Sequence, residues 1–333
     1  MSVQPRIVVL GRLDPTDTHQ VRELVQRATD ADGVTPLSEH VLLHLRHGGD
    51  APVRNVVACV DGDPGGRPAL AGYAHLDVTD VVEGASAELV VDPAWRNEGI
   101  GRRLAETLLA QTPDGRLRLW AHGEHPAAAG LAASLGLVRS RHLWQMRRSL
   151  RALLPRPVLP DGVAVRTFRP GDDDAAWVSL NARAFADHPE QGAWTEADPH
   201  RRMAEPWFDP AGFFLAERAA PDGSVRLVGF HWTKVHGNEA HEHPHEHSAG
   251  QPHDHGHGHD PIGEVYVVGV DPAEQGHGLG RALTLVGLQH LRSLGLAAVL
   301  LYVDADNASA IRLYEALGFT HWDTDVMYSS GAA

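Results

Sequence analysis

Two stretches of the sequence decide its organisation: VDPAWRNEGIGRRL at residues 91–104 and VDPAEQGHGLGRAL at residues 270–283. They lie 179 residues apart and agree nearly in register. A second pair of matches, Leu135-Gly136-Leu137 and Leu317-Gly318-Phe319, follows in the same order at a spacing of 182 residues. Two ordered matches at nearly one spacing indicate a duplicated domain.

A proline-rich linker separates the two copies. Pro155, Pro157 and Pro160 stand close together, and their fixed φ angles disfavour helix. We therefore predict an N-terminal domain over residues 1–154 and a C-terminal domain over residues 155–333. The length of 333 residues suits two domains of ordinary size.

Both copies alternate segments of strand and helix character. The second copy predicts helices at 175–186, 280–294 and 308–317 and strands at 212–217, 224–234, 264–270, 297–303 and 321–328. The first copy predicts strands at 53–60, 69–78 and 87–91 and a helix at 100–110. This interleaving favours the α/β class, with a mixed central sheet flanked by helices in each domain.

A glycine-rich loop, residues 275–281, joins a predicted strand to a predicted helix. Glycine lets backbone N–H groups approach an anion, and the start of the helix adds the positive end of its dipole. A nucleotide-binding P-loop would need Gly-Lys-Ser/Thr, which is absent here. A dinucleotide-binding fingerprint would stand early in its domain, with an acid about 20 residues on. This loop stands late in its domain and lacks that acid, so it does not match the fingerprint.

The loop and a later motif carry a family resemblance. The pattern Gln/Arg-x-x-Gly-x-Gly/Ala after a Val-Asp-Pro strand end resembles the acetyl-CoA loop of the GNAT acetyltransferase superfamily. The later motif consists of Asn307, Ala310, Tyr314, Gly318 and Phe319, and it resembles that superfamily's last helix. The resemblance implies two tandem GNAT domains that use acetyl-CoA as cosubstrate and require no metal.

Three further segments of the second copy narrow the resemblance: residues 185–192, 229–235 and 263–272. They are similar to the tandem GNAT enzymes that acetylate the cysteinyl amine of cysteinyl-glucosaminyl-inositol (desacetylmycothiol). The resemblance covers the chain except for its histidine tract. It implies direct attack of the amine on acetyl-CoA, without an acyl-enzyme.

The resemblance implies coenzyme contacts in both copies. These are Leu89, Val90, Val91, Asn97, Glu98, Gly99, Ile100, Gly101 and Arg102 in the first, and Val268, Gly269, Val270, Gln275, Gly276, His277, Gly278, Leu279, Gly280, Arg281, Asn307, Ala308, Ser309, Ala310, Ile311 and Arg312 in the second.

The resemblance also implies roles for side chains around the acceptor. Glu264, at the start of the strand that runs into the coenzyme loop, is the candidate general base, directly or through water. Tyr314 is the candidate acid for the departing sulfur. The implied acceptor-binding residues are Glu39, Glu190, Lys234, Glu264 and Tyr302.

The two copies differ at the proposed catalytic positions. Aligning them places Ala85 opposite Glu264, Ala132 opposite Tyr314 and His125 opposite Asn307. We therefore expect the first copy to bind acetyl-CoA without catalysing its reaction.

Composition limits the other possibilities. The sum of 29 Lys and Arg against 43 Asp and Glu gives a net charge of −14, which argues against nucleic acid and against a basic membrane surface. Cys59 is the only cysteine, which excludes an internal disulfide and a Cys-ligated zinc site. We expect a cytoplasmic monomer without a membrane span that acts on small molecules.

Nine of the 23 histidines lie between His236 and His259, as an insertion at residues 236–260. Imidazole suits zinc, nickel or copper, but spacing by two residues among Gly and Pro defines no rigid site.

Two alternatives to the acetylation of desacetylmycothiol stay open on the sequence. One is a tandem GNAT that acetylates another small amine or a peptide N-terminus, and the other is a non-catalytic acetyl-CoA sensor or metal-binding protein.

Overall fold

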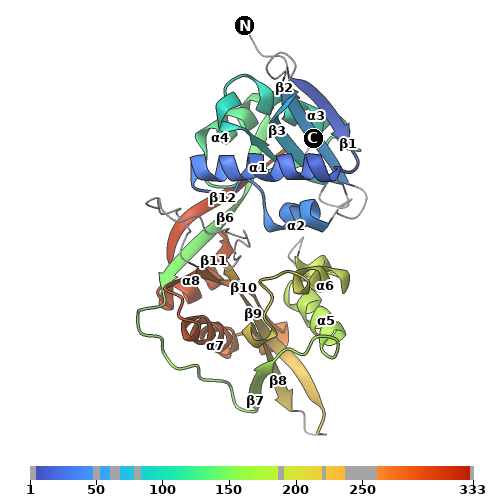
Figure 1. The fold of residues 1–333 in the computed structure, drawn as a ribbon. Helices are drawn as coiled ribbons and strands as arrows, with labels where there is room; N and C mark the ends of the chain where they lie inside the picture. The colour runs from blue at the N-terminus through green and yellow to red at the C-terminus, as the bar shows by residue number, and fades with distance from the viewer. Residues whose placement is uncertain are drawn as a thin grey trace, which may run out of the picture. The chain divides into compact units, whose positions relative to one another are not determined.

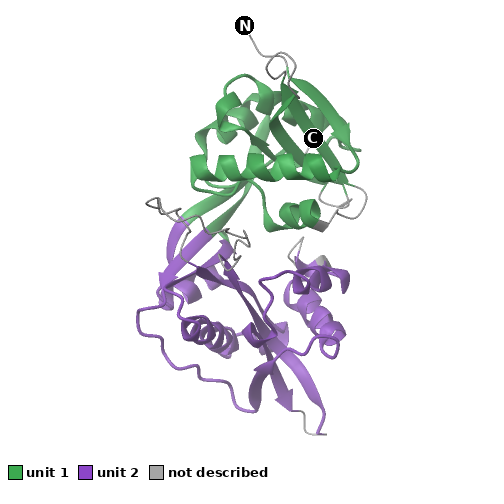
Figure 2. Cartoon of the chain, viewed as in Figure 1, with its two compact units in different colours: residues 1–144, 304–306, 323–333 green, residues 145–303, 307–322 purple. Residues whose placement is uncertain are grey.

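The computed structural model describes residues 5–47, 53–60, 68–78, 84–186, 191–219, 223–236 and 261–330. The chain divides into two compact units, coloured separately in Figure 2. Unit 1 contains residues 1–144, 304–306 and 323–333, and unit 2 contains residues 145–303 and 307–322.

Unit 1 is built on a mixed sheet with the strand order β1-β2-β3-β4-β5-β12-β6 (Figure 1). Its elements in chain order are β1 (Arg6–Leu10), α1 (Pro15–Asp32), α2 (Glu39–His47), β2 (Val53–Val60), β3 (Ala69–Asp77), β4 (Ala85–Val91), the 3-10 helix η1 (Pro93–Trp95), α3 (Ile100–Gln111), β5 (Leu117–Ala121), α4 (Pro126–Ser134) and β6 (Leu137–Ser149). Neighbours from β1 to β4 are antiparallel, whereas β4 and β5 are parallel.

The strands of unit 2 have the order β6-β11-β10-β9-β8-β7. Its elements are β7 (Val163–Thr167), α5 (Asp174–Ala184), η2 (Gln191–Ala193), α6 (Ala197–Met203), η3 (Pro210–Gly212), β8 (Phe213–Ala219), β9 (Val225–His236), β10 (Ile262–Val270), η4 (Pro272–Glu274), α7 (Leu279–Ser293), β11 (Ala298–Asp304), α8 (Ala308–Ala316) and β12 (Thr320–Ser330). Strands β10 and β11 are parallel, and the pairs from β7 to β10 are antiparallel.

Strands β6 and β12 each belong partly to both units. In unit 1 the end of β12 pairs antiparallel with β5, with Val326 opposite Ala121 and Tyr328 opposite Leu119. The boundary between the two compact units therefore falls inside β6, and the chain crosses between the units again at residues 304–306 and at residue 323. The sequence repeat instead predicts a single domain boundary between residues 154 and 155. The difference arises because the last strand of the second copy completes the sheet of unit 1.

The sheet of unit 1 is covered on both faces because successive strand residues point to opposite sides. Leu76 joins Leu104 of α3 in one hydrophobic cluster, and Val57 and Tyr73 join Leu24 of α1 in another. All five side chains are buried. Burying one leucine stabilises a fold by about 1.5–3 kcal/mol, so both helices are firmly held to the sheet.

Unit 2 has an aromatic core under α5. Phe213 stacks on Trp232 at 4.6 Å between ring centroids, and Trp177 of α5 meets Phe213 edge-on at 5.4 Å. On the other face, Gly229 permits the close approach of α7, since a Cβ there would stand 2.8 Å from Leu283 Cδ1. These packings place β9 between α5 and α7.

The expected α/β class, with a mixed sheet flanked by helices, is confirmed in both units. The helices expected at 100–110 and 280–294 are α3 and α7, and the strand expected at 264–270 is β10. None of the helices that the structure describes is long and apolar enough to span a membrane.

Candidate active site

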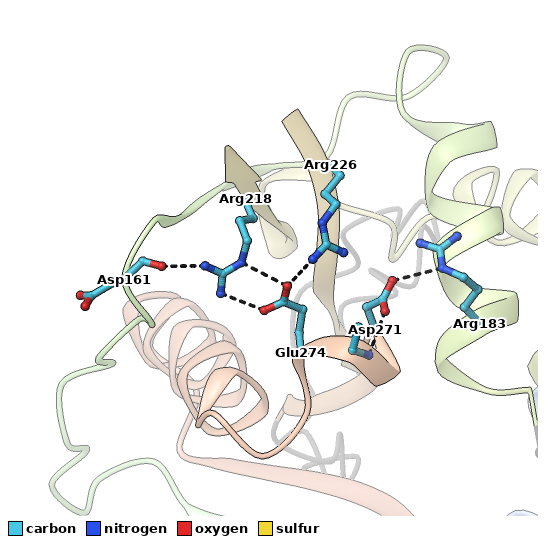
Figure 3. Close-up of polar contacts among 7 residues, drawn as sticks. Asp161, Arg183, Arg218, Arg226, Asp271 and Glu274 are labelled. Atoms are coloured by element: carbon cyan, nitrogen blue, oxygen red, sulfur yellow. Dashed lines mark hydrogen bonds and ion pairs between the residues drawn. The ribbon is translucent and has the colours of Figure 1, made fainter. Parts of the chain in front are cut away.

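The loop between β10 and α7 is fixed at its start by Asp271. Its Oδ1 accepts a hydrogen bond from the Ala273 N–H at 3.1 Å, which caps η4, and its Oδ2 lies 3.1 Å from Nε of Arg183 in α5 (Figure 3). The Asp271 N–H in turn donates to the carbonyl of Val228 at 2.9 Å. Asp271 therefore fixes both the end of β10 and the start of the loop.

Glu274, the last residue of η4, provides a second anchor (Figure 3). Its buried carboxylate accepts from Arg218 through Nε at 3.1 Å and Nη2 at 2.8 Å, and also from Arg226. Two guanidinium groups on neighbouring strands thus hold the loop before it reaches its glycines. Because the Glu274 carboxylate is buried whereas Arg218 and Arg226 are partly exposed, removing the arginines would leave a buried carboxylate without its positive partners.

The glycines of this loop need the conformations that only glycine adopts readily. Gly276 and Gly278 both have φ of +81°, and Gly278 is the N-cap of α7. Gly280 has room beside it, because a Cβ would approach only Val270 Cγ2, at 3.6 Å. The backbone N–H groups at the start of this 15-residue helix can therefore face a phosphate.

The remaining predicted coenzyme contacts of unit 2 lie on β10 and at the start of α8. Val268 and Val270 are half-buried on β10, with Gly269 between them. Asn307 caps α8, since its Oδ1 accepts from the Ala310 N–H at 3.0 Å. The start of α8 carries the other predicted contacts, from Ala308 to Arg312; Ala308, Ser309 and Arg312 are exposed, whereas Ile311 is buried.

Unit 1 contains the corresponding loop beside a cavity of about 730 Å³. Asp92 caps η1 through the Ala94 N–H at 2.9 Å, and its Oδ2 lies 2.9 Å from Nε of Arg27 in α1, as Asp271 pairs with Arg183. The cavity is lined by all the coenzyme residues predicted in this half except Glu98: Leu89, Val90, Val91, Asn97, Gly99, Ile100, Gly101 and Arg102.

The lining residues that the sequence did not predict include Trp120, His122, His125 and Tyr328. Tyr328 comes from β12, so the end of the chain helps to build the wall. His125 caps α4 by accepting from the Ala127 N–H at 3.2 Å, which matches the capping role of Asn307 in α8.

Glu264 is a buried carboxylate on β10. Only 6% of the residue is exposed, and its Oε2 lies 2.6 Å from Nε2 of His236. Desolvation by itself raises the pKa of Glu264, but the hydrogen bond and charge of His236, together with the charge of Lys234, lower it below its usual value. The carboxylate is therefore ionised at neutral pH and can accept a proton.

Lys234 is the register partner of Glu264 on β9 and is also buried. Its Nζ lies 4.6 Å from the ring centre of Trp207 and 5.4 Å from that of Tyr266. Nε of Arg202 donates to the Tyr266 hydroxyl at 2.6 Å. Cation–π attraction therefore holds the Lys234 ammonium against the rings of Trp207 and Tyr266, beside Glu264.

Sequence reasoning missed His236, Arg202, Trp207 and Tyr266. A signal existed for two of them: His236 stands two residues after Lys234 and Tyr266 two residues after Glu264, and strand residues two apart point to the same face. Arg202 and Trp207 come from α6 and the turn after it, and no spacing rule connects them to β10.

Tyr314 lies partly buried on α8, 5.8 Å between ring centres from Phe319. Burial raises the pKa of Tyr314 to about 12, so the phenol keeps its proton at physiological pH.

Tyr302 is on β11, where its hydroxyl accepts from Nε2 of Gln145 at 2.8 Å. Glu39 begins α2 in unit 1, and Glu190 lies outside the described residues.

Unit 1 has a buried acid that aligning the copies did not reveal. Oε2 of Glu88 on β4 accepts from the Ser38 N–H at 2.5 Å and lies 3.5 Å from Nε2 of His122. His122 also lies 3.1 Å from Asp325. Glu88 is thus engaged in internal contacts and is not part of the cavity wall.

Two other sequence expectations concern nucleophiles and metals. Cys59 lies on β2 of unit 1, and burial raises the pKa of its thiol, which makes it a poor nucleophile. Within the described part of the chain, no group of three or more His, Cys, Asp or Glu side chains is placed to hold a metal ion. The histidines from 241 to 259 lie outside that part.

Comparison with known proteins agrees with this architecture. The sequence profile of the acetyltransferase (GNAT) family matches residues 19–137 and 177–319. The chain belongs to the GNAT acetyltransferase family, and it contains the family's domain twice.

Individual relatives are more specific. The mycothiol acetyltransferase of Acidothermus cellulolyticus is 60% identical over 334 residues, which cover 99% of this chain and 97% of that protein. The mycothiol acetyltransferase of Streptosporangium roseum is 56% identical, over 97% and 98% of the two chains. Among solved structures, a tandem GNAT protein from the clavulanic acid biosynthesis pathway has a TM-score of 0.66 at 19% identity, over 99% of this chain and 100% of that one, and so shares the fold.

Proposed function

We propose that this chain transfers the acetyl group of acetyl-CoA to the cysteinyl amine of 1D-myo-inositol 2-(L-cysteinylamino)-2-deoxy-alpha-D-glucopyranoside, giving mycothiol and CoA. One observation carries the reaction type: a buried, ionised Glu264 stands four residues before Val268 on the strand that leads into the coenzyme loop. The choice of acceptor rests on full-length relatives that bear the name mycothiol acetyltransferase.

Coenzyme binding falls to the loop and to two helix starts. The N–H groups of residues 276–281 face the pyrophosphate, and the dipole of α7 favours its negative charge. Arg281 and the first turn of α8 complete the contacts. A strand-end N–H between Val268 and Val270 donates to the thioester oxygen and stabilises the negative charge that develops there.

The chemical step needs one base and one acid. Glu264 takes a proton from the acceptor ammonium, directly or through water, and the freed amine attacks the thioester carbonyl carbon. The tetrahedral intermediate collapses, the C–S bond breaks, and the Tyr314 phenol donates its proton to the leaving thiolate. The second proton of the attacking nitrogen passes to the Tyr314 phenolate, which restores the phenol, and Glu264 releases its proton to solvent. Burial of Tyr314 supports this role because it keeps the phenol protonated.

The acceptor carries an ammonium and many hydroxyl groups, so it needs polar partners. Lys234 and Tyr302 provide them from β9 and β11, and the family pattern adds Glu39 and Glu190. We propose that the cytoplasmic monomer binds only small molecules, in keeping with its single cysteine and acidic balance.

The cavity of unit 1 binds a second acetyl-CoA without turnover. Its loop and η1 cap match those of unit 2. The positions of Glu264 and Tyr314 hold Ala85 and Ala132, and Glu88 is occupied by Ser38 and His122.

One assay tests the proposal. Consumption of acetyl-CoA is measured with cysteinyl-glucosaminyl-inositol, with glucosamine and other simple amines, and with a peptide bearing a free N-terminus. We expect the first acceptor to give kcat/KM at least about a hundredfold above the others. Preference for another amine would overturn the acceptor, and failure to consume acetyl-CoA with any of them would overturn the enzyme assignment.

A further inference from the structure

The carboxylate of Glu264 has a partner on the neighbouring strand that the family pattern did not supply. Nε2 of His236, the last residue of β9, lies 2.6 Å from Oε2 of Glu264 near the start of β10. The two strands are antiparallel, and His236 stands opposite Ile262, so the contact runs diagonally across the pair.

Exposure differs sharply between the two partners. The Glu264 side chain is 8% exposed, whereas the His236 side chain is 39% exposed. A buried carboxylate favours its neutral form unless a donor or a positive charge offsets desolvation. His236 provides a donor aimed at one oxygen, and Lys234 provides a nearby positive charge.

Other charged and titratable groups stand on the surrounding elements. Lys234 is on β9, Tyr266 on β10, Tyr302 on β11, and Arg202 on α6. Lys234 lies over the ring of Tyr266, and Arg202 donates to its hydroxyl. His236 therefore makes the short direct contact with the carboxylate, while Lys234 acts on it through charge.

We propose that His236 is a positioning residue for acetyl transfer: its Nε2–H holds Oε2 of Glu264 and keeps the carboxylate charged, which leaves Oε1 to receive the proton of the acceptor amine. This inference rests on the proposed role of Glu264 as general base. A hydrogen bond to a charged group is worth more than a neutral one, and a buried base without it would be protonated over more of the working pH range.

The test compares kcat/KM from pH 5.5 to 9.5 in wild type, His236→Ala and His236→Gln. For His236→Ala we expect about a tenfold loss at pH 6 that narrows to about twofold at pH 9, because high pH restores the ionised base. His236→Gln keeps an N–H donor and should recover part of the loss at low pH. KM for acetyl-CoA should stay unchanged.

His200→Ala is the matched control, since His200 pairs with Asp174 at 2.7 Å elsewhere in unit 2. Its pH profile should follow that of wild type. A loss in His236→Ala that is equal at every pH, or no loss at all, would overturn the proposal.

A second readout separates this proposal from the proposed function. Carboxyl-13C glutamate labelling follows the titration of Glu264 by NMR, with Glu264→Gln used to assign its signal. The titration should move to higher pH in His236→Ala, and an unmoved titration refutes the positioning role even if no acceptor is turned over. A wild type without turnover refutes the proposed function instead.

Discussion

In unit 1, Nδ1 of His122 lies 3.1 Å from Oδ2 of Asp325, although 203 residues separate them in the sequence. Asp325 also accepts from the Gly123 N–H at 3.0 Å, and Glu88 stands on the other side of the imidazole. The end of β12 is thereby tied to the loop after β5, beside the cavity of unit 1.

This contact predicts a pH-dependent stability. Desolvation lowers the pKa of His122, but hydrogen bonds and charges from Asp325 and Glu88 outweigh it and raise the pKa to about 10. A raised folded-state pKa contributes stability that is complete below about 6.5, the value of an unperturbed histidine, and is lost as the pH rises through 10.

We therefore expect Asp325→Asn to lower the free energy of opening of β5 and β12 by about 1–3 kcal/mol at pH 6.5, with a smaller effect at pH 10.5. Amide hydrogen exchange of peptides over 117–123 and 323–330 measures it. Asp323→Asn, on the same strand, is the control. An effect that does not change with pH would contradict the assignment of the charge to His122.

Glu264→Gln tests the base. The amide cannot accept the proton of the ammonium, so kcat should fall by about 10²–10⁴-fold while KM for acetyl-CoA changes little. Steady-state kinetics with both substrates varied gives both constants. Glu217→Gln, which removes an acid paired with Arg166 elsewhere in unit 2, should be near wild type. Full activity in Glu264→Gln would exclude this residue as the base.

Tyr314→Phe tests the acid. Without the phenol, the thiolate leaves unprotonated, and we expect kcat to drop by about 10–100-fold. Because burial raises the pKa of Tyr314 to about 12, wild-type kcat should show no alkaline limb from this group up to pH 10. A limb near pH 8–9 that disappears in Tyr314→Phe would contradict the structure.

Substitutions at Gly101 and Gly280 test whether only the second copy catalyses the reaction, because the two glycines hold equivalent positions in the two copies. Each is the second residue of the helix that follows its glycine loop, and a Cβ at either would make only ordinary contacts at 3.6 Å, to Val91 Cγ2 and Leu131 Cδ2 or to Val270 Cγ2. A Cβ at either position is therefore tolerated, and an aspartate there would place a negative charge where the pyrophosphate is proposed to bind.

Gly280→Asp should abolish turnover, whereas Gly101→Asp should keep kcat within about twofold of wild type. Each should remove one of two acetyl-CoA equivalents bound in equilibrium dialysis. If Gly101→Asp binds two equivalents, the cavity of unit 1 is not a coenzyme site. If it loses turnover, the two halves are not chemically independent.

Much of the fold follows from local patterns. The apolar spacing of α7 and the Val-rich β10 predict their type and nearly their ends. The helix α1 carries a similar signal, with Val21, Leu24, Val25 and Ala28 buried after the Asp14 cap. Strand β6 has many arginines and alternates only weakly, so its pairing depends on its neighbours rather than on its own hydrophobic pattern.

The sequence by itself determined the duplication, the glycine loops and the different residues at the proposed catalytic positions of the two copies, because these depend on residue type and order alone. Only the tertiary structure decided that β12 completes unit 1 and that His236 holds Glu264. It also decided that Glu88 is engaged by Ser38 and His122. Such contacts join residues from different strands and loops, so no period along the chain encodes them; packing and the pairing of buried charges select them.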